Sequence, residues 1–264
     1  MDPAPDRAPA PSDRDLAALA ALGGFFALRA QGPPPRPLPA LAHAYGRGGP
    51  RDDDPLTRRV RRVGDALRAP EPRVAASVAH QGLAARLWSV ALGSAALYGG
   101  VPDLDPSLLR WDPMASAPDD LWLTEVRPLP GDAATVARVV LDGHLAPLAA
   151  ALRARYRIAE GLLWGNAASA LAATARELTR WSRERDRPHT AARTRALAAE
   201  LLTHPRLTGA ATTTPAFRRR SCCLYYRVPG GGLCGDCCFT RPPRPPATAP
   251  RGNPPHSSPR APAG

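Results

Sequence analysis

Hydrophobic positions recur at helical spacing through most of the chain. In DPLTRRVRRVGDALRA, Leu56, Val60, Val63 and Leu67 follow one another at steps of three and four. They therefore share one helical face, while the arginines between them stay in solvent. The next segment, VAASVAHQGLAARLWSVALGSAALYG, is apolar almost all round. Such a pattern is typical of a helix at the centre of a hydrophobic core.

A shorter helix is predicted near the start of the chain, in LAALAALGGFFALRA (Leu16 to Ala30). Ser12 or Asp13 is suited to cap its N-terminus, and Gly23 and Gly24 lie near its end. The stretch is apolar enough to imitate the core of a signal peptide. Because the segment before it is acidic rather than basic, we expect an amphipathic helix and no export signal.

Two further stretches predict helices in the second half. LAPLAAALRARYRIAEGLLWGNAASALAATARELTRW predicts one or two helices, with Leu148, Leu152, Tyr156 and Leu163 on a common stripe. HTAARTRALAAELLTHP predicts another, ended by Pro205. We expect the large aromatic residues in these helices to pack in the core; they are Trp88, Trp164, Trp181 and Tyr156.

One segment alternates in the manner of a strand. DDLWLTEVRPLP, from Asp119 to Pro130, places Leu121 and Leu123 on one side and Trp122 and Thr124 on the other. Its partner strand is not evident from the sequence. The expected fold class is mainly α with a small β component, an α+β body followed by a short cysteine-rich module.

The composition divides the chain into four segments. Residues 1–11 and 241–264 are rich in proline and poor in large apolar residues, which predicts disorder. Between them we expect a helical body over residues 12–210 and a cysteine-containing module over residues 211–240.

The charge of the chain is strongly positive, with a formal net charge of +12 over 264 residues. A basic surface can bind nucleic acid by releasing phosphate counterions. Here every basic residue is arginine, and the chain is crowded with Ala, Pro and Gly, as GC-rich coding would produce. We therefore expect no nucleic-acid partner. We also expect no membrane span, because no uninterrupted apolar run reaches about 18 to 20 residues.

All five cysteines lie in RRRSCCLYYRVPGGGLCGDCC, from Arg218 to Cys238. Cysteines of a secreted disulfide framework are normally spread along the chain to join distant segments, so the clustering favours a metal centre in a reducing compartment. The spacing is Cys222-Cys223, ten residues, Cys234, two residues, Cys237. Three consecutive glycines between the two pairs allow the chain to fold back on itself.

The spacing alone is compatible with more than one metal. Four thiolates complete the coordination of a zinc ion, although structural zinc sites usually use two separated pairs. Adjacent residues in an extended segment point to opposite faces, so Cys222 and Cys223 reach one ion only if the backbone turns there. A [2Fe-2S] centre relaxes this demand, because four thiolates are shared between two irons. A vicinal disulfide is a further alternative.

The segment RRSCCLYYRVPGGGLCGDC closely resembles the iron–sulfur segment of the FhuF family of siderophore-iron reductases, whose pattern is C-C-x₁₀-C-x₂-C. The resemblance implies that Cys222, Cys223, Cys234 and Cys237 hold a [2Fe-2S] cluster and that Cys238 does not. It extends to LAALGGFFAL, to the HQGLAARLWSVALGSAALYGGVPDLDP block and to LLWGNAASAL, and so covers most of the chain.

The family resemblance implies a cytoplasmic enzyme that reduces siderophore-bound Fe(III), with the hydroxamate class as the expected substrate. No nucleotide or nicotinamide motif is present in the sequence, so an external electron donor such as a ferredoxin or a flavoprotein reductase is expected. The alternative from another class is a non-enzymatic binding protein in which zinc stabilises the cysteine module.

Four other residues are candidates near the cysteines. Arg219, Arg220 and Arg227 flank the thiols in sequence and would raise the potential of a cluster, or contact the iron chelate, if they are also near it in space. Asn166, beside Trp164 on an apolar helix, either braces the core or faces the substrate cleft. The six histidines show no common ligand spacing, and no metal is assigned to them.

Overall fold

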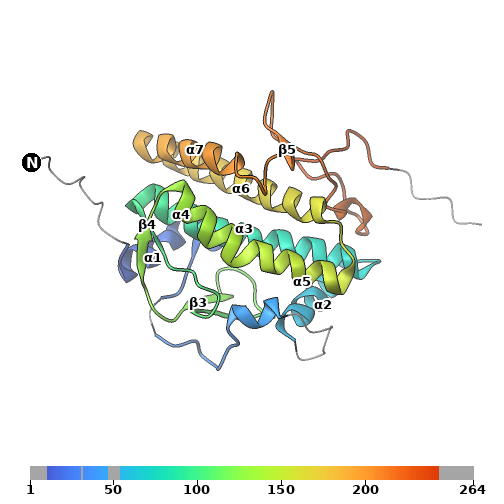
Figure 1. Cartoon of the computed structure of the whole chain (residues 1–264), viewed down its shortest axis with the longest axis horizontal. Helices are drawn as coiled ribbons and strands as arrows, with labels where there is room; N and C mark the ends of the chain where they lie inside the picture. The colour runs from blue at the N-terminus through green and yellow to red at the C-terminus, as the bar shows by residue number, and fades with distance from the viewer. Residues whose placement is uncertain (1–10, 31, 47–53, 244–264) are drawn as a thin grey trace, which may run out of the picture.

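A long helix, α3 (Pro72–Tyr98), runs through the middle of the molecule, and the other helices pack around it (Figure 1). The computed structural model describes residues 11–30, 32–46 and 54–243. The segments predicted to be disordered, 1–11 and 241–264, fall almost entirely outside the described residues. The remaining α-helices are α1 (Asp13–Ala18), α2 (Pro55–Leu67), α4 (Ala133–Ala137), α5 (Ala146–Tyr156), α6 (Glu160–Glu184) and α7 (Pro188–Leu202).

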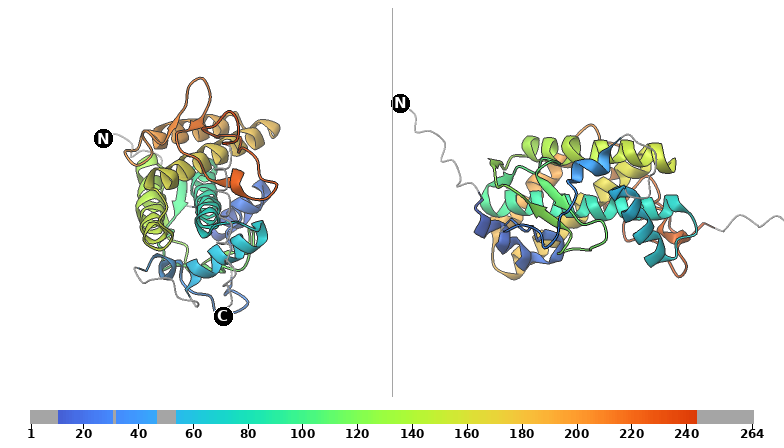
Figure 2. Two further views of the ribbon diagram at one scale, coloured as in Figure 1. Left: turned by 90° about the vertical axis from the view of Figure 1, so that its right-hand side faces the viewer. Right: turned by 90° about the horizontal axis from the view of Figure 1, so that it is seen from below.

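The apolar surface of α3 is buried on all sides, as its pattern predicts. It contacts α6 and α7 on one side and α5 and α2 on others, an arrangement that Figure 2 shows from two directions. Trp88 is fully buried, and its indole N–H donates to the carbonyl oxygen of Ala167 on α6 at 3.1 Å. The predicted core role is therefore confirmed for Trp88.

The predicted helix near the start is confirmed in part. Ser12 caps α1 and exchanges hydrogen bonds with Asp15 in a capping box. The α-helix ends at Ala18, and two 3₁₀ segments, η1 (Leu19–Leu22) and η2 (Gly24–Phe26), follow it. A third, η3 (Leu41–Tyr45), lies in the connection before α2.

The long stretch from residue 145 onward forms two helices rather than one. Arg157 adopts a left-handed backbone conformation with φ of 52° and ends α5. The predicted stripe is therefore interrupted, because Leu163 lies on α6 while Leu148 and Leu152 lie on α5. Tyr156 packs against the core but is only partly buried.

In the described residues, the strands form three short antiparallel pairs. The segment predicted as one strand holds two, β3 (Leu121–Leu123) and β4 (Pro128–Pro130), which pair with β2 (Leu109–Trp111) and β1 (Gly100–Pro102) respectively. The third pair joins β5 (Ala211–Thr212) to β6 (Arg218–Arg219), just before the cysteines. The mainly α fold with a small β component is confirmed.

One helix among the described residues is long and apolar enough to cross a membrane. It spans Ala133–Tyr156, where α4, the π-helical segment η4 (Arg138–Leu145) and α5 follow one another without a break. Its most apolar window is 61% buried inside the structure, and core helices of soluble proteins pass the same test. The absence of a membrane span stays a prediction.

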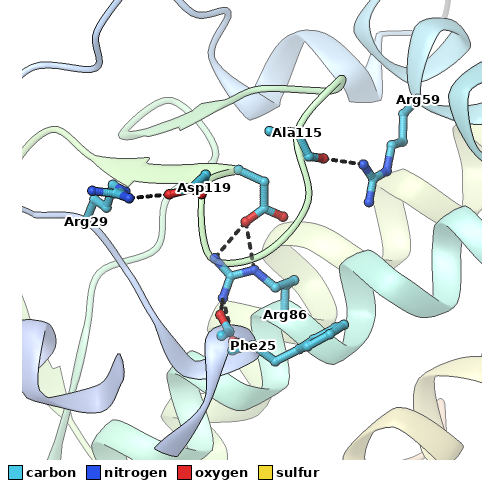
Figure 3. A network of polar contacts seen from close by, with 8 residues as sticks. Phe25, Arg29, Arg59, Arg86, Ala115 and Asp119 are labelled. Atoms are coloured by element: carbon cyan, nitrogen blue, oxygen red, sulfur yellow. Dashed lines mark hydrogen bonds and ion pairs between the residues drawn. The ribbon is translucent and has the colours of Figure 1, made fainter. Parts of the chain in front are cut away.

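A buried ion pair fastens the strand region to α3 (Figure 3). The guanidinium of Arg86 lies 2.8 Å from the carboxylate of Asp120, and both side chains are almost completely buried. Arg86 also donates to the carbonyl oxygens of Gly24 and Phe25. Around it, Arg29 pairs with Asp119 at the surface. Three segments distant in sequence thus meet at one arginine.

A second buried polar contact involves His144 on η4. Its Nε2 lies 2.5 Å from the carbonyl oxygen of Leu104, and its Nδ1 lies 2.7 Å from the hydroxyl of Tyr45. Burial lowers the pKa of His144 to about 4, so the imidazole is neutral at pH 7. Nε2–H then donates to Leu104, and Nδ1 accepts from Tyr45.

Replacing Arg86 with methionine tests the ion pair. Arg86→Met leaves the carboxylate of Asp120 buried without a partner, and we expect the free energy of unfolding to fall by about 3 to 5 kcal/mol. Urea unfolding followed by circular dichroism measures this. Arg62→Met, at an exposed position of α2, is the matched control and should change stability by less than about 0.5 kcal/mol. Equal effects of the two substitutions would contradict this account of the pair.

The depressed pKa of His144 predicts a pH dependence of stability. The unfolded imidazole, with its ordinary pKa of 6.5, takes up a proton between pH 6.5 and about 4, whereas the folded one does not. The contribution of His144 to the free energy of unfolding is therefore fully present above pH 6.5. It falls by about 1.4 kcal/mol per pH unit as the pH drops through this window. Urea unfolding at several pH values should show a smaller slope in His144→Gln; an unchanged slope would rule out this contribution.

Candidate metal centre

The cysteine segment folds back on itself at its glycines. Gly230 has a φ of +72°, which favours glycine, and a Cβ at Gly231 would lie 2.4 Å from the carbonyl oxygen of Tyr225. The turn brings the two cysteine pairs together, with the Sγ atoms of Cys223 and Cys234 3.7 Å apart. The predicted return of the chain at these glycines is confirmed.

Backbone N–H groups point at two of the sulfurs. Leu224 N–H donates to Cys222 Sγ at 3.3 Å, and Phe239 N–H donates to Cys237 Sγ at 3.4 Å. Leu224 has a left-handed φ of 68°, so the backbone turns directly after the adjacent pair. Such N–H···S bonds stabilise thiolates and tune the potential of iron–sulfur centres.

The chemistry and spacing of the thiols fit a metal–sulfur group. Two thiolates on one tetrahedral ion with metal–sulfur bonds of about 2.3 Å are separated by about 3.8 Å, close to the distance between Cys223 and Cys234. All five cysteines are free, so none forms a disulfide. Within the described ranges, no group of three or more His, Cys, Asp or Glu side chains is arranged to hold a metal ion. The four-cysteine ligand set stays a prediction.

Burial makes these thiols weak acids in the absence of metal. Burial, together with the like charge that the neighbouring thiols would add, raises the pKa of Cys222 to about 11 and that of Cys234 to about 12. A coordinating metal ion reverses this balance, since a metal-bound thiol is deprotonated outright. Binding of metal here is therefore coupled to release of protons.

A buried arginine lies beside the thiols. Arg219 is 2% exposed, and its Nη2 donates to Asn166 Oδ1 and to the carbonyl oxygen of Leu162. Its Nε and Nη1 have no hydrogen-bond partner among the described residues. The positive charge lowers the pKa of Cys234, although burial raises it by more. Arg219 is thus a desolvated cation whose charge acts on the Cys234 thiol.

Asn166 joins the two central helices to the cysteine segment. It is fully buried, and its Nδ2 donates to the backbone oxygen of Ser77 on α3 at 2.9 Å. Ser77 Oγ in turn donates to the carbonyl oxygen of Cys223 at 2.8 Å. The sequence left open whether Asn166 braces the core or faces a substrate cleft, and these hydrogen bonds correspond to a brace. We call Ser77, Asn166 and Arg219 the polar brace.

The other two candidate arginines lie elsewhere. Arg220 is exposed, and it lines a surface pocket with Trp164 and Arg206. Arg227 forms an ion pair with Glu71 at the start of α3 and bonds the hydroxyl of Tyr226. The structure therefore brings Arg219 and Asn166 together beside the thiols and leaves Arg220 in solvent and Arg227 paired with a carboxylate.

Small residues on α6 make room for the cysteine segment. A Cβ at Gly165 would lie 2.3 Å from Ser221 Oγ, which itself donates to the carbonyl oxygen of Gly161. One turn further along, Ser169 Oγ donates to the carboxylate of Asp236 at 2.9 Å. Asp236 lies between Cys234 and Cys237, so this bond fixes the second cysteine pair to the helix.

Sequence reasoning missed three polar residues near the site: Ser77, His80 and Asp236. Each carried a signal, because Ser77 and His80 interrupt an apolar helix and Asp236 stands inside the C-x-x-C turn. His80 is buried, with both ring nitrogens lacking partners among the described residues. Burial and the charge of Arg219 lower its pKa to about 3, so it is neutral.

Comparison with known protein families agrees with this geometry. Residues 72–222 match the family described as ferric iron reductase FhuF-like transporter, and residues 219–239 match the FhuF 2Fe-2S C-terminal domain. No curated protein matches the chain. The first match alone covers more than half of the chain, and the second contains every cysteine. The chain therefore belongs to the FhuF family of ferric iron reductase-like proteins and carries its [2Fe-2S] domain.

Proposed function

We propose that this protein is a cytoplasmic ferric-siderophore reductase, which passes one electron to siderophore-bound Fe(III) and releases Fe(II). Membership of a ferric iron reductase family supports iron reduction in general. Hard oxygen ligands hold ferric iron far more tightly than ferrous iron, so one added electron loosens the complex. An external one-electron donor, such as a ferredoxin or a flavoprotein reductase, supplies the electron.

In this proposal, Cys222, Cys223, Cys234 and Cys237 hold the cluster. The observation that carries it is the meeting of the two pairs at 3.7 Å inside the segment that matches the [2Fe-2S] domain. A bound [2Fe-2S] cluster supplies single-electron exchange, which fits the one-electron reduction of ferric iron. The protein's own side chains therefore need to move no proton and form no covalent bond to substrate.

Arg219 acts in this proposal as the buried counter-charge of the cluster. Its unpartnered Nε and Nη1 and its effect on Cys234 support this role. Asn166 holds the guanidinium in place, and Ser77 holds Asn166. A nearby cation favours the more negative, reduced form of a thiolate-ligated centre, so Arg219 raises the potential.

We assign different roles to the helical body, residues 12–210, and to the cysteine module, residues 211–240. The two nevertheless pack against each other. Asp236 bonds Ser169, and Cys223 bonds Ser77, so the module lies directly on α6 and α3. This contact supports a division of labour in which the body positions the substrate and the module delivers the electron.

Substitution of single cysteines tests the ligand set. We expect Cys234→Ser to abolish the visible absorption of anaerobically purified protein and its dithionite-sensitive bands, because a ligand is lost. Cys238→Ser is the matched control and should keep both, along with two irons and two sulfides per chain. Loss of the cluster in Cys238→Ser would break the assignment. A colourless wild-type protein carrying one zinc would support the zinc-stabilised binding protein instead.

Substitution of Arg219 tests the counter-charge. We expect Arg219→Gln to lower the midpoint potential by about 60 mV, the one-electron equivalent of a tenfold change in equilibrium constant. Arg219→Lys keeps the charge and should retain most of the potential, and Arg220→Gln, in solvent, should leave it unchanged. Redox titration followed by absorbance measures all three. Equal potentials in Arg219→Gln and Arg220→Gln would contradict the role of Arg219.

A further inference from the structure

His80 is a buried polar side chain of α3 to which the proposed function gives no role. It is 1% exposed, and neither ring nitrogen has a hydrogen-bond partner among the described residues. A neutral imidazole always carries one N–H donor and one acceptor nitrogen. Buried donors of this kind are nearly always paired in native proteins. The N–H of His80 therefore requires an acceptor that the described part of the chain does not supply.

The neighbours of His80 on its own helix offer no acceptor. Side chains three and four residues away lie next to it on the helix surface. Three of these are apolar and buried: Ala76, Leu83 and Ala84. The fourth, Ser77, already uses its hydroxyl twice, since it donates to the carbonyl oxygen of Cys223 at 2.8 Å and accepts from Asn166 Nδ2 at 3.1 Å. The acceptor must come from beyond α3.

The face of α3 that carries Ser77 and His80 adjoins the cysteine module. The helix also contacts the 3₁₀ segment η5 (Tyr225–Arg227), which follows the first cysteine pair. Burial, and after it the charge of Arg219, lower the pKa of His80 to about 3. The same charge lowers the pKa of the Cys234 thiol, which burial raises by more. The imidazole and the thiol thus have Arg219 as a common neighbour.

We propose that His80 is a further residue of the metal centre and donates its ring N–H to a sulfur atom of the [2Fe-2S] cluster, an inference that rests on the proposed function. Thiolate and sulfide sulfurs carry the negative charge of such a cluster and accept hydrogen bonds. Backbone N–H groups of the cysteine segment already donate to two of the thiols. His80 adds a donor from the helical body.

A hydrogen bond of this kind favours the reduced form of the cluster. Reduction adds one electron, so the sulfurs become more negative and accept more strongly. The proton is shared with sulfur and stays on the ring of His80, so the electron moves without a proton. Arg219 acts through its full charge, whereas His80 acts through one directed bond, and both raise the potential.

Histidine labelled with ¹⁵N in its ring tests this bond without any substitution. We expect pulsed EPR of the dithionite-reduced, full-length protein to show a weak ¹⁵N coupling, as a hydrogen bond transmits. The coupling should vanish in His80→Leu and persist in His144→Leu, the control at a buried histidine whose nitrogens contact Tyr45 and Leu104. A coupling of the size of a direct iron–nitrogen bond would overturn the donor role. No coupling in wild type would show that His80 bonds another partner, such as water.

The midpoint potential gives a second measurement, which a packing role alone would not change. We expect His80→Leu to shift the equilibrium about tenfold toward the oxidised form, a fall of about 59 mV. His80→Gln keeps an N–H donor and should retain most of the potential, and His144→Leu should leave it unchanged. Equal potentials in His80→Leu and wild type would contradict the proposal.

Failure of this inference and failure of the proposed function give different results. If the protein holds its cluster and reduces ferric chelates but shows neither the coupling nor the shift, only the role of His80 is wrong. If the coupling and the shift are present but no ferric chelate is reduced, His80 keeps its role and the reductase function is wrong. A colourless protein without a cluster would exclude both.

Discussion

The requirement that α3 be buried on every side organises this molecule. A helix of 27 residues without a polar face cannot remain in water, so it must be covered by several other elements. Helices α6 and α7, α5, α2 and the N-terminal 3₁₀ segments each cover part of it. The few polar groups that α3 carries are then forced to find partners among these neighbours. Arg86 meets Asp120, and Ser77 meets Asn166 and Cys223.

These polar contacts decide where the cysteine segment lies. An unpaired polar group costs free energy when it is buried, so Ser77, Asn166 and Arg219 fix one another's positions. The backbone of Cys223 is one end of the chain of bonds, and Arg219, three residues before the first cysteine, is the other. The thiol segment therefore takes its place from the interior of the helical body. The glycine turn of the segment only brings the two cysteine pairs together.

Local patterns predicted much of this arrangement. The apolar pattern predicted α3 and α2, Ser12 was one of two residues predicted to cap the first helix, and the glycine run between the cysteine pairs predicted the return of the chain. The role of Gly165 was not predictable, because a glycine inside a helix says nothing about which distant atom lies against it. The sequence also did not show which of the neighbouring arginines is buried beside the thiols. Arg219 and Arg220 are neighbours in sequence, and only the direction of β6 places one in the core and the other in solvent.

The pairing of the strands was missed for a related reason. The segment from 119 to 130 reads as one strand, but a bend between Leu123 and Pro128 divides it between two partners that precede it in the chain. Short pairs of this kind are selected by tertiary contacts, here with α3 and the N-terminal segment, rather than by local propensity. The end of α5 likewise depends on the left-handed conformation of Arg157, a residue with no intrinsic preference for it.

If the thiols hold the proposed cluster, the polar brace affects the speed of electron exchange. A centre that gains and loses charge is slowed by every dipole that must reorient with it, and mobile water is the largest source of such dipoles. Here the carbonyl of Cys223, the amide of Asn166 and the guanidinium of Arg219 are fixed by one another in a nearly dry interior. Their dipoles are already oriented before the charge changes. In the proposed reductase, the reorganisation energy on this side of the thiols would therefore be small, which would lower the barrier to electron transfer.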